Sequence, residues 1–191
     1  MAELYVGLVH YPIYNKRMHV IAGAVTNFDI HDISRTCRTY DVKRYYIIHP
    51  LDVQRDIIKK IIGYWQDGYG RTYNPDRSNA LDIVCWQADI EAAAQDIEAQ
   101  TGKRPYIVTT DARIYPNTVS YSFMRKQLKE GDRPILLLFG TGFGIEAETM
   151  GKFDYILEPI YGSCDYNHLC VRSAAAIILD RLAGESWWEK E

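Results

Sequence analysis

The chain has 191 residues, a formal net charge of −3 and an isoelectric point near 6.0. This length fills one domain and is short for two, so we expect a single domain over residues 1–191. The charge excludes the general basic surplus typical of nucleic-acid-binding proteins, although a local cluster of cations can still bind RNA on an acidic protein.

The sequence also limits where the protein works and what it binds. No apolar stretch is long enough to span a bilayer, and the first residues lack the basic and apolar regions of a signal peptide. The cysteines show neither CxxC pairs nor zinc-ligand spacing. We therefore expect a cytoplasmic protein with reduced thiols, no membrane partner and no bound metal. A metal site built from His10, His31 and Asp32 is conceivable, but no ligand spacing favours it.

Apolar runs bounded by turn residues alternate along the chain with helical patterns. The predicted strands cover residues 4–10, 44–49, 81–86, 105–109, 134–139 and 153–158, and residues 19–25 form a short extended or edge segment. The predicted helices cover residues 26–40, 52–67, 89–101, 117–130 and 169–180. Strands that alternate with helices indicate an α/β fold, with a mostly parallel sheet flanked by helices.

Local patterns add detail to three of these segments. Asn27 or Asp29 is expected to cap the helix at 26–40, and residues 68–77 read as a long polar loop. The helix at 52–67 is expected to bury an apolar stripe. That stripe consists of Val53, Ile57, Ile58, Ile61 and Ile62.

The last third of the chain carries two strand ends with glycine-bearing loops. The first loop is Gly140-Thr-Gly-Phe-Gly144, and the second begins with Pro159-Ile-Tyr-Gly162. Each loop precedes a helical stretch, which is how α/β proteins build small-molecule pockets. The spacing GxGxG differs from the GxGxxG of dinucleotide-binding proteins, so an NAD-dependent oxidoreductase is only a minor alternative.

Three stretches in order carry a resemblance to a known family. Residues 29–42 contain Arg35-Thr36-Cys37, residues 136–144 run from a strand into a Phe-Gly turn, and residues 159–176 join a Pro-x-x-Gly loop to an alanine-rich helix. Together they resemble the motifs of the SPOUT class of RNA methyltransferases, in its SpoU-type branch. The resemblance covers nearly the whole chain and is closest to a small bacterial group that consists of the catalytic domain alone.

The resemblance implies a fold and a cofactor. Members have a C-terminal deep trefoil knot, a rare exception to the rule against threaded loops. They use S-adenosylmethionine, which the knotted loops hold, and they form homodimers in which Trp187 and Trp188 would lie near the interface. The positions expected to bind the cofactor, with Leu138, Ile160 and Leu169 packing against its adenine, are Thr109, Leu138, Phe139, Gly140, Thr141, Gly142, Gly144, Glu158, Ile160, Gly162, Leu169 and Cys170.

The resemblance also suggests how methyl transfer to tRNA or rRNA would proceed. Arg35 occupies the place of the arginine that is proposed to act on the ribose 2′-hydroxyl or on the phosphate beside it. Because an arginine is a poor base, phosphate binding and orientation is the role we expect. Asn27 and Asn167 would hold the ribose, and His168 completes the expected catalytic set.

Departures from the motifs leave alternatives open. The second motif has Gly142 near the place of its usual glutamate. The third has Cys170 where the family has asparagine, and His168 in place of a serine. Two alternatives to ribose methylation therefore stand: methylation of a base, as in the guanine-N1 branch, and RNA binding without catalysis. The groups that would serve base methylation are His31, Asp32, Asp165 and His168.

Overall fold

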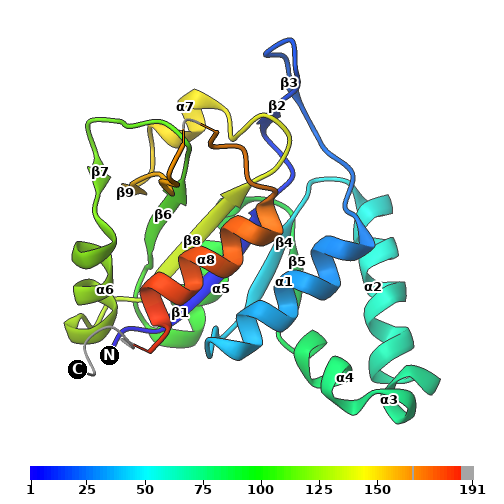
Figure 1. Cartoon of the computed structure of the whole chain (residues 1–191). Helices are drawn as coiled ribbons and strands as arrows, with labels where there is room; N and C mark the ends of the chain where they lie inside the picture. Colours follow the sequence, from blue (N-terminus) through cyan, green and yellow to red (C-terminus); the bar gives the residue numbers. More distant parts are fainter. Residues whose placement is uncertain (165, 186–191) are drawn as a thin grey trace.

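The computed structural model describes residues 1–164 and 166–185. Its centre is a parallel sheet of seven strands in the order β5-β4-β1-β8-β6-β9-β7 (Figure 1). The strands are β1 (Leu4–Val9), β4 (Tyr45–Ile48), β5 (Val84–Gln87), β6 (Tyr106–Thr110), β7 (Thr118–Val119), β8 (Ile135–Gly140) and β9 (Tyr155–Leu157). Every pairing in this sheet is parallel, so the predicted α/β fold is confirmed.

Helices cover both faces of the sheet. They are α1 (Asn27–Thr39), α2 (Asp52–Gln66), α3 (Tyr69–Tyr73), α4 (Pro75–Leu81), α5 (Ile90–Thr101), α6 (Tyr121–Glu130), α7 (Ala147–Met150) and α8 (Val171–Ala183). One face packs against α1, α2, α4, α6 and α8, and the other packs against α5 and α7. In Figure 1, α1 and α8 lie in front of the central strands and α5 lies behind them.

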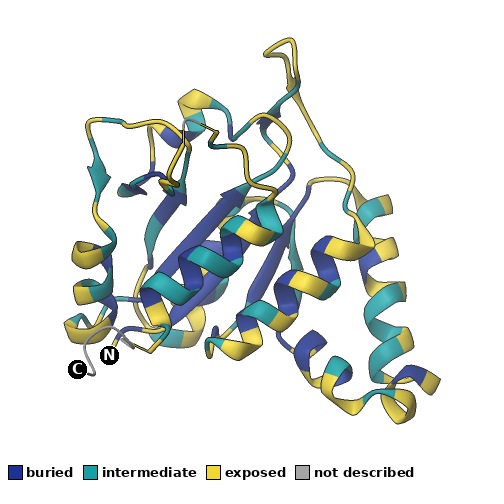
Figure 2. Cartoon of the chain, viewed as in Figure 1, coloured by how far each residue is buried: buried dark blue, intermediate teal, exposed yellow. Residues whose placement is uncertain are grey.

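The central strands are buried on both sides, as parallel strands covered by helices must be. In β8, Leu137 and Phe139 join the larger core cluster, while Leu136 and Leu138 join the smaller one on the opposite face. Figure 2 shows these strands uniformly dark and the helices dark only on their inner sides. This double burial is why the strands read as continuous apolar runs in the sequence.

A small hairpin follows β1 and projects beyond the sheet (Figure 1). Its strands β2 (Ile13–Tyr14) and β3 (Val20–Ile21) pair antiparallel. The extended segment expected at residues 19–25 is therefore a strand of a separate two-stranded sheet. The main sheet takes no strand from it.

The structure corrects two local predictions near the start of the helical layer. Thr26, rather than Asn27 or Asp29, is the N-cap of α1; its hydroxyl accepts a hydrogen bond from the Asp29 backbone N–H. The Asp29 carboxylate in turn accepts a hydrogen bond from the Thr26 backbone N–H, and the two bonds form a capping box. Residues 68–77 are not a polar loop, because they fold into α3 and the start of α4.

Two further predictions are wrong in part. Of the apolar stripe expected on α2, only Ile58 is buried, and Val53 and Ile57 are 60% and 41% exposed. The helix lies beyond β4 and β5 at the edge of the sheet and packs on α3 and α4, so part of its apolar face has nothing to cover it. The helix expected from residue 117 begins at Tyr121, because Thr118 and Val119 pair with β9 as an edge strand.

Candidate active site

The predicted cofactor loops leave the sheet from three adjacent strands. β6 lies between β8 and β9, and Thr109 is in register with Leu138 on one side and Ile156 on the other. The carboxyl ends of parallel strands meet at one edge of a sheet, which is where α/β proteins bind ligands. The segments after residues 110, 140 and 157 therefore form one cluster of loops, as the motifs predict.

The glycine loop after β8 is fixed by the segment that follows β1. The Thr141 hydroxyl donates to the Val9 carbonyl at 2.9 Å. The Tyr14 N–H donates to the Gly144 carbonyl at 2.9 Å, and the Phe143 N–H donates to the Tyr14 carbonyl at 3.0 Å. These bonds hold together two segments that are far apart in the sequence.

Glycine is required within this loop. Gly142 and Gly144 have φ angles of 60° and 102°, in the region that other residues rarely adopt. A Cβ atom at Gly142 would lie 2.9 Å from the Tyr14 carbonyl oxygen. The loop keeps its shape only while these two positions carry no side chain.

The loop after β9 presents an unpaired backbone. Among the described residues from Pro159 to Leu169, no backbone group hydrogen-bonds to another backbone group. Ile160 packs against the core, whereas Gly162 and Leu169 are exposed. Free amide and carbonyl groups beside an exposed apolar side chain suit a ligand such as adenine, which needs hydrogen bonds at its edge and apolar contact on its face.

At other predicted cofactor positions the side chains pack in the core or hydrogen-bond to the backbone. Leu138 and Phe139 are buried in the two core clusters, and the packing of Leu138 on adenine stays a prediction. The Thr109 hydroxyl donates to the Leu138 carbonyl at 3.3 Å. A Glu158 carboxylate oxygen accepts from the Tyr121 N–H at 3.0 Å, at the start of α6.

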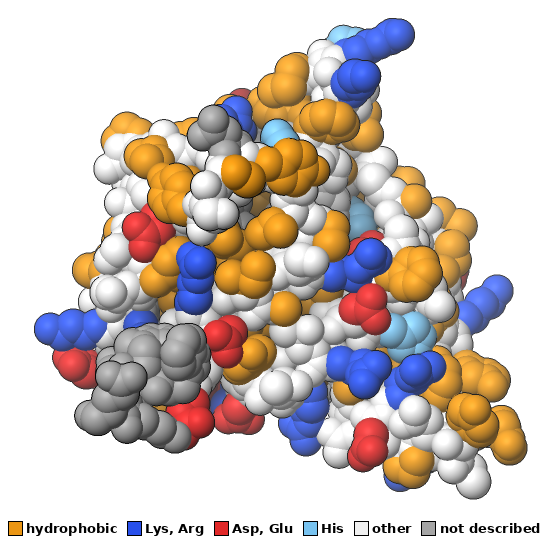
Figure 3. Space-filling model, in the orientation of Figure 1, with side chains coloured by type: hydrophobic (Ala, Val, Ile, Leu, Met, Phe, Trp, Pro, Cys, Tyr) orange, Lys and Arg blue, Asp and Glu red, His pale blue; other side chains and the backbone are white. Residues whose placement is uncertain are grey.

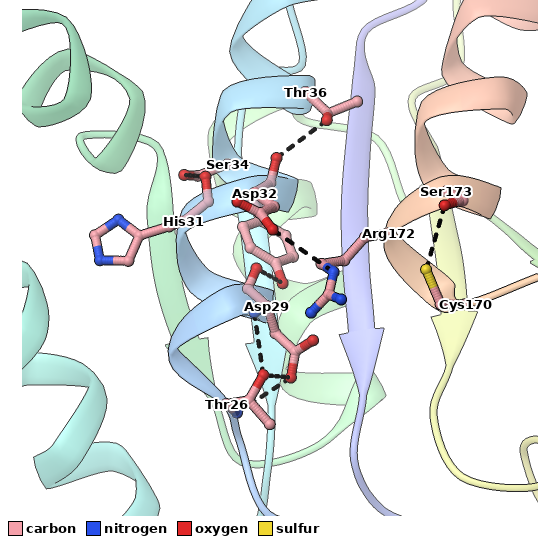
Figure 4. Close-up of polar contacts among 10 residues, drawn as sticks. Thr26, Asp29, His31, Asp32, Ser34, Thr36, Cys170, Arg172 and Ser173 are labelled. Carbon is pink, nitrogen blue, oxygen red and sulfur yellow. Dashed lines mark hydrogen bonds and ion pairs between the residues drawn. The ribbon is translucent and has the colours of Figure 1, made fainter.

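The start of α8 lies beside α1 and joins it by a charged contact. The Arg172 guanidinium lies 3.6 Å from the Asp32 carboxylate and 5.1 Å from the centre of the Phe28 ring. Cys170 is exposed at the N-cap, and its sulfur lies 3.2 Å from the Ser173 hydroxyl. That hydrogen bond lowers the pKa of the Cys170 thiol below its usual value. Figure 4 shows the Arg172–Asp32 pair between α8 and α1, and the Cys170–Ser173 contact at the start of α8.

Arg35 lies on α1 above a groove between α1 and α8. The groove has a volume of about 370 Å³ and is lined by Asp32, Arg35, Thr36, Thr39, Tyr40 and Ala176. Arg35 is exposed, and no described carboxylate pairs with its guanidinium. Its neighbour Asp32 is engaged by Arg172. The groove thus offers the Arg35 guanidinium, whose charge no described carboxylate neutralises.

None of the other described catalytic candidates, Asn27, Asn167 and His168, lines the groove beside Arg35. Asn27 lines a different pocket, together with His31, on another side of α1. Asn167 is half-buried, and His168 is exposed with its ring edge-on to Tyr166 at 5.5 Å. Asp165, Trp187 and Trp188 lie outside the described residues.

A pair of histidines was missing from the predicted site. His10 and His49 follow β1 and β4, and their rings lie 6.0 Å apart. His10 is buried, neither of its ring nitrogens has a hydrogen-bond partner among the described residues, and burial lowers its pKa to about 4. Each histidine ends an apolar run in the sequence, so their shared place at the carboxyl edge could have been predicted from the parallel order of the strands.

Residues 1–164 and 166–185 contain no group of three or more His, Cys, Asp or Glu side chains that could hold a metal ion. No helix in the same residues has the length and apolar character needed to cross a membrane.

The sequence is similar to two kinds of relative. It is 47% identical over 180 residues to an uncharacterized protein of Aquifex aeolicus, covering 94% of this chain and 88% of that protein. It is 43% identical over 184 residues to a tRNA (guanine-N(1)-)-methyltransferase of Oleidesulfovibrio alaskensis. That match covers 96% of this chain but only 43% of the relative, so the chain spans less than half of the named enzyme.

The fold is similar to that of the SpoU methyltransferase AviRb from Streptomyces viridochromogenes, solved in complex with AdoMet. The TM-score is 0.56 with 14% sequence identity, over 95% of this chain and 57% of that one. A family profile described as SAM-dependent RNA methyltransferase matches residues 3–184. The predicted family is thus confirmed: the chain belongs to the S-adenosylmethionine-dependent RNA methyltransferases, and its fold is that of the SpoU-type enzymes.

Proposed function

We propose that this protein methylates a ribose 2′-hydroxyl of tRNA or rRNA, with Arg35 holding the RNA backbone at the reaction site. The observation that carries the proposal is the exposed Arg35 guanidinium, which faces a groove beside α8 and has no carboxylate partner among the described residues. A 2′-hydroxyl lies next to a phosphodiester, so a fixed cation there both binds the strand and orients the nucleophile.

The loops after β6, β8 and β9 fit the cofactor. S-adenosylmethionine supplies an activated methyl group, so the protein has to align the acceptor oxygen and let its proton leave. The unpaired backbone of residues 159–164 and 166–169 would bind the adenine edge, and Ile160 and Leu169 would contact its face. The glycine loop at 140–144 would close over the remainder, without side chains in the way.

The described carboxylates favour a ribose over a guanine base. Methylation at guanine N1 requires a group that removes the N1 proton, and a free carboxylate would suit that task. Asp111 is held by three hydrogen bonds from Arg113, and Glu158 accepts from the Tyr121 N–H. Asp32 lies against Arg172. Asp111, Glu158 and Asp32 are therefore already engaged, while Asp165 lies outside the described residues.

Guanine-N1 methylation is the second candidate, because a relative of 43% identity carries that name. More than half of that relative lies outside the match, and the chemistry behind its name can reside there. The trefoil knot, the homodimer, the single-domain organisation and the cytoplasmic location remain predictions that accompany the proposal.

The first experiment is calorimetric titration with S-adenosylmethionine and, separately, with NAD. Micromolar binding of S-adenosylmethionine alone is expected. Tritiated methyl transfer to total tRNA and to deproteinised rRNA then identifies the substrate, and mass spectrometry of the digested nucleosides identifies the modified atom. A 2′-O-methylated nucleoside supports the proposal, and 1-methylguanosine supports the second candidate. Cofactor binding with no transfer to any RNA would favour a non-catalytic RNA-binding protein.

A further inference from the structure

A second depression lies on the other side of α1 from α8 and plays no part in the proposed reaction. It has a volume of about 330 Å³ and is formed by α1, α2 and α4. None of the side chains that line it is acidic. The lining residues are Asn27, His31, Lys60, Ile61, Tyr64, Trp65 and Arg77.

The cations of this pocket, Lys60 and Arg77, are not neutralised by any acid in the described part of the chain. Elsewhere many cations pair with acids, as Arg104 does with Glu91 at 2.7 Å and Lys103 with Asp132 at 2.6 Å. No described carboxylate pairs with Lys60 or Arg77. In Figure 3, Lys and Arg side chains gather with a His over the region of α1 and α4. Their charge is available to an anionic partner.

The walls of the pocket are aromatic and planar. The Arg77 guanidinium lies 4.8 Å from the centre of the Trp65 ring. Tyr64 and His31 meet the same indole edge-on, at 5.3 and 5.5 Å, and Tyr64 remains 53% exposed. The Nδ1 atom of His31 is buried without a hydrogen-bond partner among the described residues. A planar ligand with polar edges can stack on such a surface and bond to the histidine.

The pocket lies close to the Arg35 groove. His31 and Arg35 are four residues apart on α1, which is about one helical turn. Figure 4 shows the His31 side chain directed away from Arg172 and α8. The charges of Arg77 and Arg35 both help to lower the pKa of His31, after the larger effect of burial. One strand crossing α1 can therefore reach both sites.

We propose that the pocket binds one unpaired nucleotide of the substrate RNA, next to the nucleotide held at Arg35. Its base stacks on the Arg77–Trp65 layer and on Tyr64, and its phosphate is held by Lys60. This inference rests on the proposed function for the identity of the strand. A single-stranded segment is favoured over a duplex because paired bases are stacked on each other and cannot enter a side-chain pocket.

The test measures the binding of fluorescein-labelled RNA to the full chain by anisotropy. The probes are an A10 single strand, a U10 single strand and a ten-base-pair RNA duplex. Binding of the single strands in preference to the duplex is expected. Tyr64→Ala and Arg77→Ala should weaken this binding about ten-fold or more, because each removes a stacking partner. Lys60→Ala should reduce the slope of log affinity against log salt by roughly 0.7.

A matched control separates the pocket from general charge. Arg104→Ala removes one positive charge from a paired, exposed arginine on a different element and should bind as the wild type does. Thermal melting of each variant checks folding, and Lys60→Glu, an exposed substitution, gives a second variant where Arg77→Ala melts early. The inference would be overturned if every pocket variant bound the single strands as tightly as the wild type does, or if the wild type preferred the duplex.

The same variants distinguish this inference from the proposed function. If Tyr64→Ala and Lys60→Glu transferred methyl groups at the wild-type rate, the proposed nucleotide pocket would be wrong and the proposed methyltransferase activity would stand. If the protein bound A10 through the pocket but did not bind S-adenosylmethionine, the proposed methyltransferase activity would be wrong and the nucleotide pocket would stand.

Discussion

The imidazole rings of His10 and His49 lie 6.0 Å apart at the carboxyl ends of the neighbouring strands β1 and β4. A His49 ring nitrogen hydrogen-bonds to the Gly23 carbonyl, whereas neither ring nitrogen of His10 has a hydrogen-bond partner in the described part of the chain. Below them the hairpin segment and the glycine loop meet, because Gly23 packs near both His10 and Thr141. Burial disfavours a positive charge on His10 by more than the nearby Asp29 carboxylate stabilises it.

We therefore predict that the free energy of unfolding falls as the pH drops from about 6.5 to 4. The pKa of His10 is about 4 in the folded protein, against an ordinary value of 6.5. In that window the unfolded chain binds a proton that the folded protein does not, so stability is present above pH 6.5 and is lost toward pH 4. The linked loss is about 3 kcal/mol, since each pKa unit corresponds to about 1.4 kcal/mol.

Urea unfolding at pH values from 7.5 to 4.5 measures this dependence. His10→Leu should abolish most of the dependence of the unfolding free energy on pH. His19→Ala, which removes an exposed histidine, should leave that dependence unchanged. His49 adds to the slope in the same direction, because burial lowers its pKa as well. A slope that is equal in the wild type and in His10→Leu would contradict the assignment.

The glycine loop offers a test of cofactor binding that is separate from stability. Gly142→Ala and Gly102→Ala both place a side chain at a positive φ, at 60° and 73°, so each should cost about 1–2 kcal/mol of folding free energy. A Cβ at Gly142 also lies 2.9 Å from the Tyr14 carbonyl, whereas at Gly102 it meets nothing within 4 Å. Only Gly142→Ala should weaken the binding of S-adenosylmethionine in calorimetry, by ten-fold or more. Equal weakening by both would mean that lost stability, and not the loop, is responsible.

The order of strands and helices could be predicted because both faces of this sheet are buried, which makes each strand a continuous apolar run. The exposed part of the α2 stripe could not, because Val53 and Ile57 have the helical spacing of a core face but lie at the sheet edge. The family motifs indicated where the loops lie. They did not show that Glu158 caps α6 or that Asn27 and Arg35 line different depressions, since both depend on tertiary contacts between distant segments.

Arg35→Ala should abolish methyl transfer and leave cofactor affinity unchanged, because Arg35 lies on α1 and the cofactor loops follow β6, β8 and β9. We expect a loss of at least a hundred-fold in kcat/KM, as for removal of a positioning group. Arg35→Lys should recover part of the activity, since it restores the charge without the planar fork. Arg104→Ala is the charge-matched control. Full methyl-transfer activity in Arg35→Ala would show that Arg35 has no role in the reaction.

The reactivity of the cysteines tests the cofactor site without an RNA substrate. Cys170 is exposed and its pKa is lowered by the Ser173 hydrogen bond, whereas Cys37 is buried and burial raises its pKa. Iodoacetamide should therefore alkylate Cys170 rapidly and Cys37 only after unfolding, because the thiolate is the reactive form. Peptide mass spectrometry identifies each site, and a Cys164→Ser background removes the other exposed thiol.

Saturating S-adenosylmethionine should slow the alkylation of Cys170 several-fold, and NAD at the same concentration should not. The reason is position: Cys170 ends the loop after β9 whose backbone is free to bind the adenine, and it directly precedes α8. A Cys170 rate that S-adenosylmethionine leaves unchanged, in a protein that calorimetry shows to bind it, would place Cys170 outside the cofactor site. The Pro159-to-Gly162 segment would then have to hold the adenine without help from the start of α8.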